Sequence, residues 1–309
     1  MIELEPQEDN VDYPPRLGTP ATDDATDWHA PSPGAVHARL PRVDLCGTPI
    51  DALEVDEAVQ WLGRAIDQNA RMQVCTVNLD FLVSARQDKE VRSILEQAEL
   101  NLADGAPLLW LSRAAGQPLP GRAAGADLIP RLMLAAAQQG WRIFLLGGEN
   151  GVGAVAAAEL VRQYPTLAIA GVYEPPRSAL EDMNDDEILR QLAAANADIL
   201  LVALGHPKQE KWIHRHRDGL QVQVSIGVGC TLDLLAGRHT RAPLWMRTRG
   251  LEWLYRLGNE PRRLSRRYVK DGLVFAVFLL PHSISQRRQR RNAASDAGDG
   301  GVNRVSPRS

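Results

Sequence analysis

Residues 199–210 read Ile-Leu-Leu-Val-Ala-Leu-Gly-His-Pro-Lys-Gln-Glu and join an apolar run to a glycine turn and a helix start. The run Ile199–Ala203 is short and uninterrupted, which predicts a strand buried on both faces of a sheet. Pro207 suits the first position of a helix, so the chain passes from strand to helix within a few residues. A strand that leads directly into a helix is typical of a parallel sheet with helical crossovers.

The same alternation continues through the chain from residue 72. Further strands are predicted at Gln73–Val77, Leu100–Ala103, Arg142–Leu146, Leu167–Ala170 and Val222–Val228. Helices are predicted at Asp127–Gln139, Gly153–Gln163 and Leu180–Asn196. We therefore expect an α/β fold with a mostly parallel, Rossmann-like sheet covered by helices on both faces. In such folds, ligands bind beyond the carboxyl ends of the strands.

Other segments surround this α/β region, which we place at residues 41–240. Residues 43–50 predict a hairpin around a glycine turn, and an amphipathic helix is predicted after it. Residues 1–40 are rich in Pro, Asp and Ala without periodicity and predict a disordered leader, and residues 292–309 predict a disordered tail.

Residues 241–291, called the C-terminal appendage below, are strongly basic. They hold thirteen Arg or Lys against three acids, a charge of +10 in a chain of net charge −3. Phosphates of lipids, diphosphates or nucleic acids are the expected partners. The apolar stretch Leu273–Leu280 is too short to span a bilayer and has arginines on both sides, which predicts a helix in the membrane interface. Trp245 and Trp253 predict that the appendage packs against the rest of the protein.

The cysteine pattern and the first residues favour a cytoplasmic protein. Cys46, Cys75 and Cys230 are odd in number and widely spaced, which predicts neither a disulfide framework nor a zinc site. The first residues lack the basic and apolar regions of a secretory signal, and no run of eighteen apolar residues is present.

Candidate functional groups follow the predicted strands. Asp104 could act as a general base toward a sugar hydroxyl, or it could cap the next helix. Thr76 and Asn78 end another strand and could likewise bind substrate or cap a helix. Lys208 could meet a phosphate and Gln209 a base or sugar, or both could belong to an ordinary helix start.

A second group of candidates suits phosphate. Arg122 lies among small residues and could bind a phosphate bidentately, or it could be solvated at the surface. The glycine turn at Gly147 and Gly148 could offer backbone N–H groups to a diphosphate. A similar turn, Gly227–Gly229, leads to Asp233.

Several motifs resemble those of the WecG/TagA/CpsF glycosyltransferases, which are bacterial enzymes of glycosyltransferase family twenty-six. The resemblance covers roughly residues 41–282, and the motifs follow the order of the family. They are Thr76–Asp80 (TVNLD), Ala103–Pro107 (ADGAP), Gly205–Glu210 (GHPKQE), Arg241–Trp245 (RAPLW), Gly250–Leu257 (GLEWLYRL) and Glu260–Leu264 (EPRRL).

The resemblance implies an inverting transfer of a sugar from a UDP donor to a polyprenyl-diphosphate-linked saccharide in cell-surface polysaccharide synthesis. N-acetylmannosamine, glucose or a related hexose would be transferred, at the inner face of the cytoplasmic membrane. Asp104 would be the catalytic base, with Thr76 and Gln209 in the active site. Asn78 and Arg122 would bind substrate. The appendage would complete the site with Arg256, Arg263 and Arg266.

No cofactor and no metal are expected. Many nucleotide-sugar transferases hold a divalent cation with two aspartates separated by one residue, and the sequence lacks this triplet. The appendage arginines would then stabilise the leaving diphosphate. The alternatives are a nucleic-acid-binding protein, suggested by the basic appendage, and a dinucleotide-dependent oxidoreductase. We favour the transferase and expect no nucleic acid as partner, and a homo-oligomer is compatible with the sequence.

Overall fold

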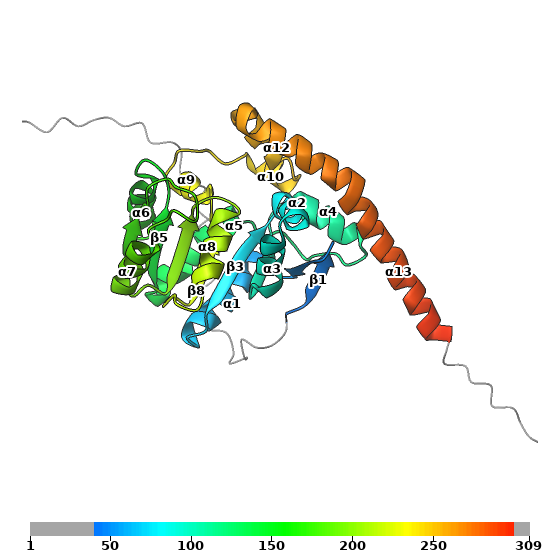
Figure 1. Ribbon diagram of the computed structural model, residues 1–309, viewed down its shortest axis with the longest axis horizontal. Coiled ribbons are helices and arrows are strands. Elements are labelled where there is room, and N and C mark those ends of the chain that lie inside the picture. Colours follow the sequence, from blue (N-terminus) through cyan, green and yellow to red (C-terminus); the bar gives the residue numbers. More distant parts are fainter. Residues whose placement is uncertain (1–39, 300–309) are drawn as a thin grey trace, which may run out of the picture.

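A computed structural model describes residues 40–299 and contains, in that range, one eight-stranded sheet. The strands are β1 (Arg42–Leu45), β2 (Thr48–Asp51), β3 (Met72–Val77), β4 (Leu100–Ala103), β5 (Arg142–Gly147), β6 (Ala168–Tyr173), β7 (Ile199–Ala203) and β8 (Val224–Gly227). They lie in the order β1-β2-β4-β3-β8-β7-β5-β6 (Figure 1). All neighbours pair in parallel except β1 and β2, which form the predicted hairpin. The predicted α/β fold is confirmed. Residues 1–39 of the predicted leader lie outside the described residues.

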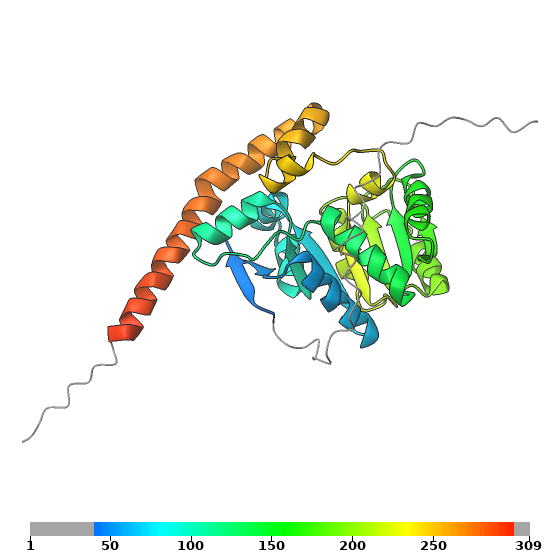
Figure 2. The same cartoon turned by 180° about the vertical axis from the view of Figure 1, so that it is seen from behind.

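Helices cover both faces of the sheet, as Figures 1 and 2 show from opposite sides. One face is covered by α1 (Val55–Asp67), α5 (Gly125–Gln139), α6 (Val152–Gln163) and α9 (Thr231–Leu235). The other is covered by α2 (Leu79–Gln87), α3 (Lys89–Gln97), α4 (Ala106–Ala114), α7 (Asp185–Ala195) and α8 (Lys208–His216). Along β7, Leu201 packs against the helices on the first face of the sheet and Val202 against those on the second face. This alternation explains why the strands are apolar throughout.

The two largest differences between predicted and observed boundaries have local reasons. The helix predicted from Leu180 begins only at Asp185, because the side chain of Asn184 accepts a hydrogen bond from the backbone N–H of Glu187 and caps the helix there. The strand predicted to end at Ala170 continues to Tyr173, because its ladder with β5 continues that far.

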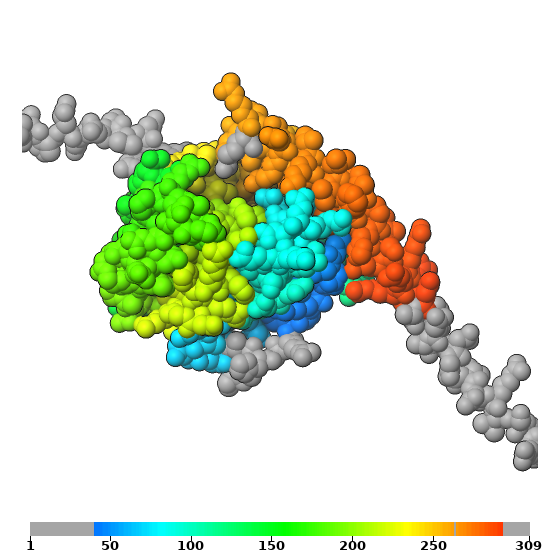
Figure 3. Space-filling view, viewed as in Figure 1, coloured from blue at the N-terminus to red at the C-terminus, as the bar shows by residue number. Residues whose placement is uncertain are grey.

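The C-terminal appendage forms helices along one edge of the molecule (Figures 1 and 3). They are α10 (Leu244–Thr248), α11 (Glu252–Asn259), α12 (Pro261–Val274), the π-helical turn η1 (Phe275–Leu279) and α13 (Leu280–Asp299). α12 contacts α2, and α13 contacts α4. Between these two helices, Leu279 of η1 anchors the appendage to the protein. It is 1% exposed and belongs to the apolar cluster that contains Leu45 and Leu111. The predicted helical appendage is confirmed.

Two expectations about the appendage need correction. Trp245 and Trp253 are 54% and 43% exposed, so burial of these tryptophans is not what packs the appendage; helices α10 and α11 are too short to bury a full face. In addition, α13 runs to Asp299, past residue 292, where the disordered tail was predicted to begin. Residues 300–309 of that predicted tail lie outside the described range. Among the helices of residues 40–299, none is long and apolar enough to cross a bilayer.

Substituting Gly147 by Ala should destabilise the fold at the end of β5. Gly147 has a φ of +98°, and a Cβ there would lie 2.4 Å from the carbonyl oxygen of Ala203. That oxygen accepts a hydrogen bond from the backbone N–H of Gly148, so it cannot move away from the new Cβ without weakening this hydrogen bond. We expect urea denaturation to show a loss of about 2 to 4 kcal/mol in unfolding free energy.

Gly140→Ala is the matched control for this substitution. Its φ is +75°, and nothing lies within 4 Å of the position that its Cβ would take. Only the backbone strain, about 1 to 2 kcal/mol, should be lost. Equal losses in the two variants would contradict the assigned clash at Ala203.

Candidate active site

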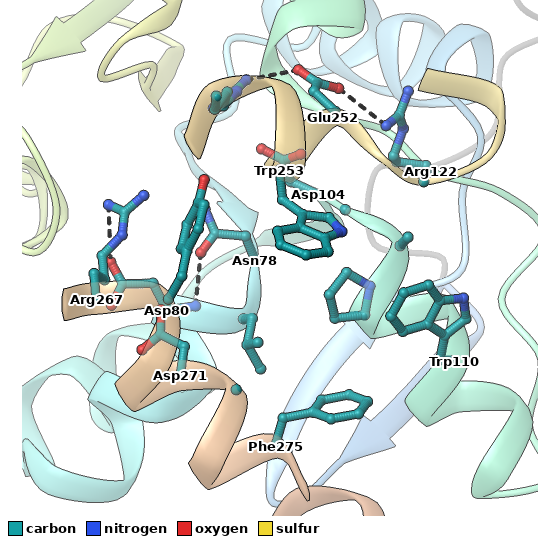
Figure 4. A pocket seen from close by; sticks show the side chains of 18 residues that line it. Asn78, Asp80, Asp104, Trp110, Arg122, Glu252, Trp253, Arg267, Asp271 and Phe275 are labelled. Carbon is teal, nitrogen blue, oxygen red and sulfur yellow. Dashed lines mark hydrogen bonds and ion pairs between the residues drawn. The ribbon is translucent and has the colours of Figure 1, made fainter. Parts of the chain in front are cut away.

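A cavity of about 330 Å³ lies between the carboxyl ends of β3 and β4 and the C-terminal appendage. Polar groups gather at two ends of it (Figure 4). The arginine end is formed by Asp104, Arg122, Glu252 and Arg256, and the carboxylate end by Asp80, Arg267 and Asp271. The cavity is therefore closed by residues separated by more than a hundred positions in the sequence.

Asp104 follows β4 directly and its carboxylate faces the arginine end. Its backbone N–H donates to the carbonyl of Val77 at 2.7 Å, which ties the end of β4 to the end of β3. The N-cap of α4 is Gly105, so Asp104 does not cap that helix. The helix-cap alternative is therefore not what the structure contains.

The environment of Asp104 makes it a proton acceptor near neutral pH. Burial raises the pKa of Asp104 to about 6, from an ordinary value of 3.8. The guanidinium of Arg256 lowers this pKa, Glu252 raises it, and Arg122 lowers it. A carboxylate with a pKa of about 6 is ionised at neutral pH and is a stronger base than an ordinary aspartate.

An ion-pair chain holds the arginine end together. Glu252 accepts from Arg122 Nη1 at 3.3 Å and from Arg256 Nη2 at 2.8 Å. Arg122 also contacts Asp127 at 3.4 Å, and Asp127 accepts from Arg241 Nη2 at 2.6 Å. This series of ion pairs therefore links the start of α5 to the appendage through Glu252 and through Arg241.

Asn78 combines the two roles that the sequence left open. Its side-chain oxygen accepts a hydrogen bond from the backbone N–H of Asp80 at 3.0 Å and caps α2. Asn78 also lines the cavity. Its side-chain amide N–H groups are the part suited to a ligand.

The structure places Thr76, Lys208 and Gln209 outside the cavity lining. Gln209 is 3% exposed, donates to the Glu210 carboxylate at 2.6 Å and accepts from the backbone N–H of Gly229 at 3.2 Å. Lys208 donates to the carbonyl of Ser178 at 2.8 Å. Thr76 is 8% exposed within β3. Substrate contact by these three residues stays a prediction.

The glycine turn after β5 also lies away from the cavity. The N–H of Gly148 already donates to the carbonyl of Ala203 at 3.1 Å, and the N–H of Gly151 donates to Glu174 at 2.9 Å. The N–H of Gly148 proposed for a diphosphate is thus occupied, and so is the N–H of Gly151 in the same turn. Asp233, on α9, does not line the cavity either.

Of the two arginines predicted on α12, Arg266 does not reach the cavity. Arg266 is exposed and outside the lining, and Arg263 is described only as part of the helix backbone. Arg267, one position further, lines the cavity and lies 3.6 Å from Asp80. Successive residues of a helix point about 100° apart, so the motif alone could not choose between them.

Most of the other lining residues were not predicted from the sequence. Trp110 and Phe275 form an apolar wall with ring centroids 6.3 Å apart, and Glu252, Trp253 and Asp271 were not singled out as ligands. Glu252 and Trp253 lie inside a quoted motif, which was the available signal. Within residues 40–299, no group of three or more His, Cys, Asp or Glu side chains is arranged to hold a metal ion.

Comparison with known proteins places these residues in a family. A family model described as the glycosyl transferase WecG/TagA/CpsF family matches residues 43–290. A Bacillus subtilis protein named N-acetylglucosaminyldiphosphoundecaprenol N-acetyl-beta-D-mannosaminyltransferase is 35% identical over 201 residues, 65% of this chain and 77% of its own length.

Two further relatives bear the same name. The protein from Bacillus spizizenii is 33% identical over 213 residues, which are 69% of this chain and 81% of that protein. The protein from Staphylococcus aureus strain MRSA252 is 28% identical over 227 residues, which are 73% of this chain and 87% of that protein. The matched family range includes both the α/β region and the C-terminal appendage.

Proposed function

The chain belongs to the WecG/TagA/CpsF family of glycosyltransferases, and on that premise we propose that it transfers a hexose from a UDP donor to a polyprenyl-diphosphate-linked saccharide. The names of the relatives favour N-acetylmannosamine as the sugar and a diphosphoundecaprenol-linked N-acetylglucosamine as the acceptor. Family membership also favours this transferase over the nucleic-acid-binding and dinucleotide-dependent alternatives.

The observation that supports the reaction best is the position of Asp104 beside two arginines. In the proposed step, the Asp104 carboxylate takes the proton of the acceptor hydroxyl. The hydroxyl oxygen forms a bond to the anomeric carbon while the bond from that carbon to the UDP oxygen breaks. One displacement of this kind inverts the anomeric configuration. We assign to Asn78, which follows β3 and lines the same cavity, the role of orienting a sugar.

The leaving diphosphate requires cationic stabilisation, and we assign it to Arg122 and Arg256. Burial lowers the pKa of Arg256, but Cys230, Glu252 and Asp104 raise it by more, so its guanidinium stays charged. Fixed cations in a partly closed cavity stabilise developing negative charge without having to reorganise.

Asp104→Asn should lower sugar transfer by about two to four orders of magnitude, because it removes the base and keeps the size of the side chain. Release of UDP with a prenyl-diphosphate-linked acceptor is the measurement. In the wild type, the rate should rise with pH through about 6, since Asp104 must be ionised to accept the proton. Arg256→Gln should move this rise to higher pH, because Arg256 lowers the pKa of Asp104.

Two controls separate catalysis from folding. Asp56→Asn, at an exposed carboxylate on α1, should retain full activity. Because the folded-state pKa of Asp104 is raised, the ionised carboxylate destabilises the folded protein above about pH 6, and this penalty vanishes near pH 4. Asp104→Asn should therefore be at least as stable as the wild type at pH 8. Near wild-type turnover in this variant would remove Asp104 as the base.

We propose that the transfer needs no divalent metal, since Arg122 and Arg256 supply the positive charge. The lack of an aspartate pair separated by one residue supports this. Activity measured after EDTA treatment should equal the untreated rate. Recovery of activity only on addition of Mg²⁺ or Mn²⁺ would overturn the assignment of the arginines.

We also propose that the protein lies on the inner face of the cytoplasmic membrane through its appendage. Leu273 and Val277 are 62% and 52% exposed, beside a strongly basic segment. Apolar side chains and cations on one surface bind an anionic bilayer interface. The membrane-linked acceptors named for the relatives support this location.

The combined Leu273→Asp and Val277→Asp substitutions should weaken binding to anionic phospholipid vesicles by about tenfold or more. Sedimentation with vesicles measures the bound fraction. Val155→Asp is the matched control, because Val155 is 48% exposed but lies on α6, outside the appendage. Equal loss in the control, or no loss in the double variant, would contradict the assigned surface.

A further inference from the structure

The carboxylate end of the cavity has no role in the proposed displacement and contains an unsatisfied buried group. Asp271, on α12, is 4% exposed, and its Oδ1 atom has no hydrogen-bond partner among the described residues. Asp80, at the start of α2, lies 3.6 Å from Arg267 on the same wall. Figure 4 shows these three side chains at the opposite end of the cavity from Arg122 and Glu252.

A buried carboxylate oxygen without a partner is costly in a folded protein, so its presence in a cavity indicates a ligand that supplies a donor. Ionised carboxylates only accept hydrogen bonds. Asp80 is paired with Arg267, but Asp271 adds a second carboxylate to this wall, which disfavours a phosphate and favours hydroxyl or amide N–H groups. The chemistry of this end therefore suits an uncharged, hydroxyl-rich group.

The wall beside the two carboxylates is aromatic. Trp110 is 45% exposed, and its ring lies edge-on to that of Phe275 at a centroid distance of 6.3 Å. Pro107 and Tyr268 line the same cavity. Aromatic faces next to a few convergent polar groups bind ligands that present both an apolar face and polar edges. A sugar ring has this character.

We propose that Asp80 and Asp271, with the aromatic wall of Trp110 and Phe275, bind the saccharide of the acceptor. This inference rests on the proposed function and deepens it. The two ends of the cavity then divide the substrates: the arginine end takes the diphosphate of the donor, and the carboxylate end takes hydroxyl or acetamido groups of the acceptor sugar. Asp104, at the arginine end, receives the acceptor hydroxyl that reacts.

The surroundings of Asp271 are consistent with a binding carboxylate. Burial, and then the negative charge of Asp80 on α2, raise its pKa, which lies at about 6. Arg267 and Lys270 on α12, and His206 before α8, lower it. The group is therefore mostly ionised above pH 7 and accepts donors from a ligand there.

Asp271→Asn and Asp80→Asn test the assignment. The substrates are UDP-N-acetylmannosamine and a short-chain prenyl diphosphate linked to N-acetylglucosamine. Each variant should raise the KM for the acceptor about tenfold, as expected when a charge-assisted hydrogen bond is replaced by a neutral one. The KM for the donor and the kcat should stay close to wild type. Unchanged acceptor KM in both variants would overturn the proposal.

Lys270→Gln is the matched control on the same helix turn as Asp271. Lys270 donates to Gln87 of α2 at 3.1 Å and does not line the cavity, so its loss perturbs the docking of α12. Because Lys270 also lowers the pKa of Asp271, the KM is measured at pH 8, where that carboxylate stays ionised. It should leave the acceptor KM unchanged. An equal rise in this control would show that Asp271 acts only through docking of the helix and would overturn the proposal.

Direct binding separates this inference from the proposed reaction. Calorimetry measures the binding of two compounds without any turnover. One is the prenyl diphosphate that carries the sugar, and the other is the same prenyl diphosphate without it. Asp271→Asn should weaken binding of the sugar-bearing compound only. Tighter binding of both compounds would mean that the carboxylates face the diphosphate, and the inference would fall. If the wild type binds the sugar-bearing compound but transfers no hexose from any UDP donor, the proposed function fails while the subsite stands.

Discussion

Glu252 bridges Arg122 and Arg256, and the candidate site depends on this bridge. Arg122 precedes α5, whereas Glu252 and Arg256 belong to α11 of the appendage, so the bridge joins the two parts of the protein. Glu252 and Arg256 form part of the cavity wall, and burial is the main cause of the raised pKa of Asp104. Through this bridge, α11 therefore shields the carboxylate of Asp104 from solvent.

The same bridge connects ligand binding with docking of the appendage. A partly buried guanidinium without a counter-charge is unfavourable, which explains why both arginines are paired with Glu252. On the proposed function, a diphosphate would compete with Glu252 for their N–H groups. The contact with Arg122, at 3.3 Å, is longer than that with Arg256, at 2.8 Å. The Arg122 side is therefore the easier one to exchange for a phosphate.

The sequence predicted the sheet well because each buried strand is apolar along its whole length, a local signal. β4 and β7 have the predicted boundaries. It also placed Asp104 at a strand end, where parallel sheets expose their ligands. Gln209 was different, since its amide is used up by the adjacent Glu210 and by Gly229, which only the folded chain brings to it. The carboxylate end could not be predicted, because it exists only once α12 docks on α2.

The sequence of α12 and η1 nevertheless contains a pattern that reflects the docking of α12 on α2. Arg267, Asp271, Phe275 and Leu279 are spaced four residues apart, and all four face the protein. In a regular α-helix such a stripe drifts about 40° around the axis at each step. The π-helical turn Phe275–Leu279 has more residues per turn, which turns the chain less per residue and reverses the drift. The reversed drift brings Leu279 back toward the line of Asp271, where it reaches the apolar core. The stripe changes from charged to apolar where the cavity gives way to that core, so one helix face both closes the cavity and anchors the appendage.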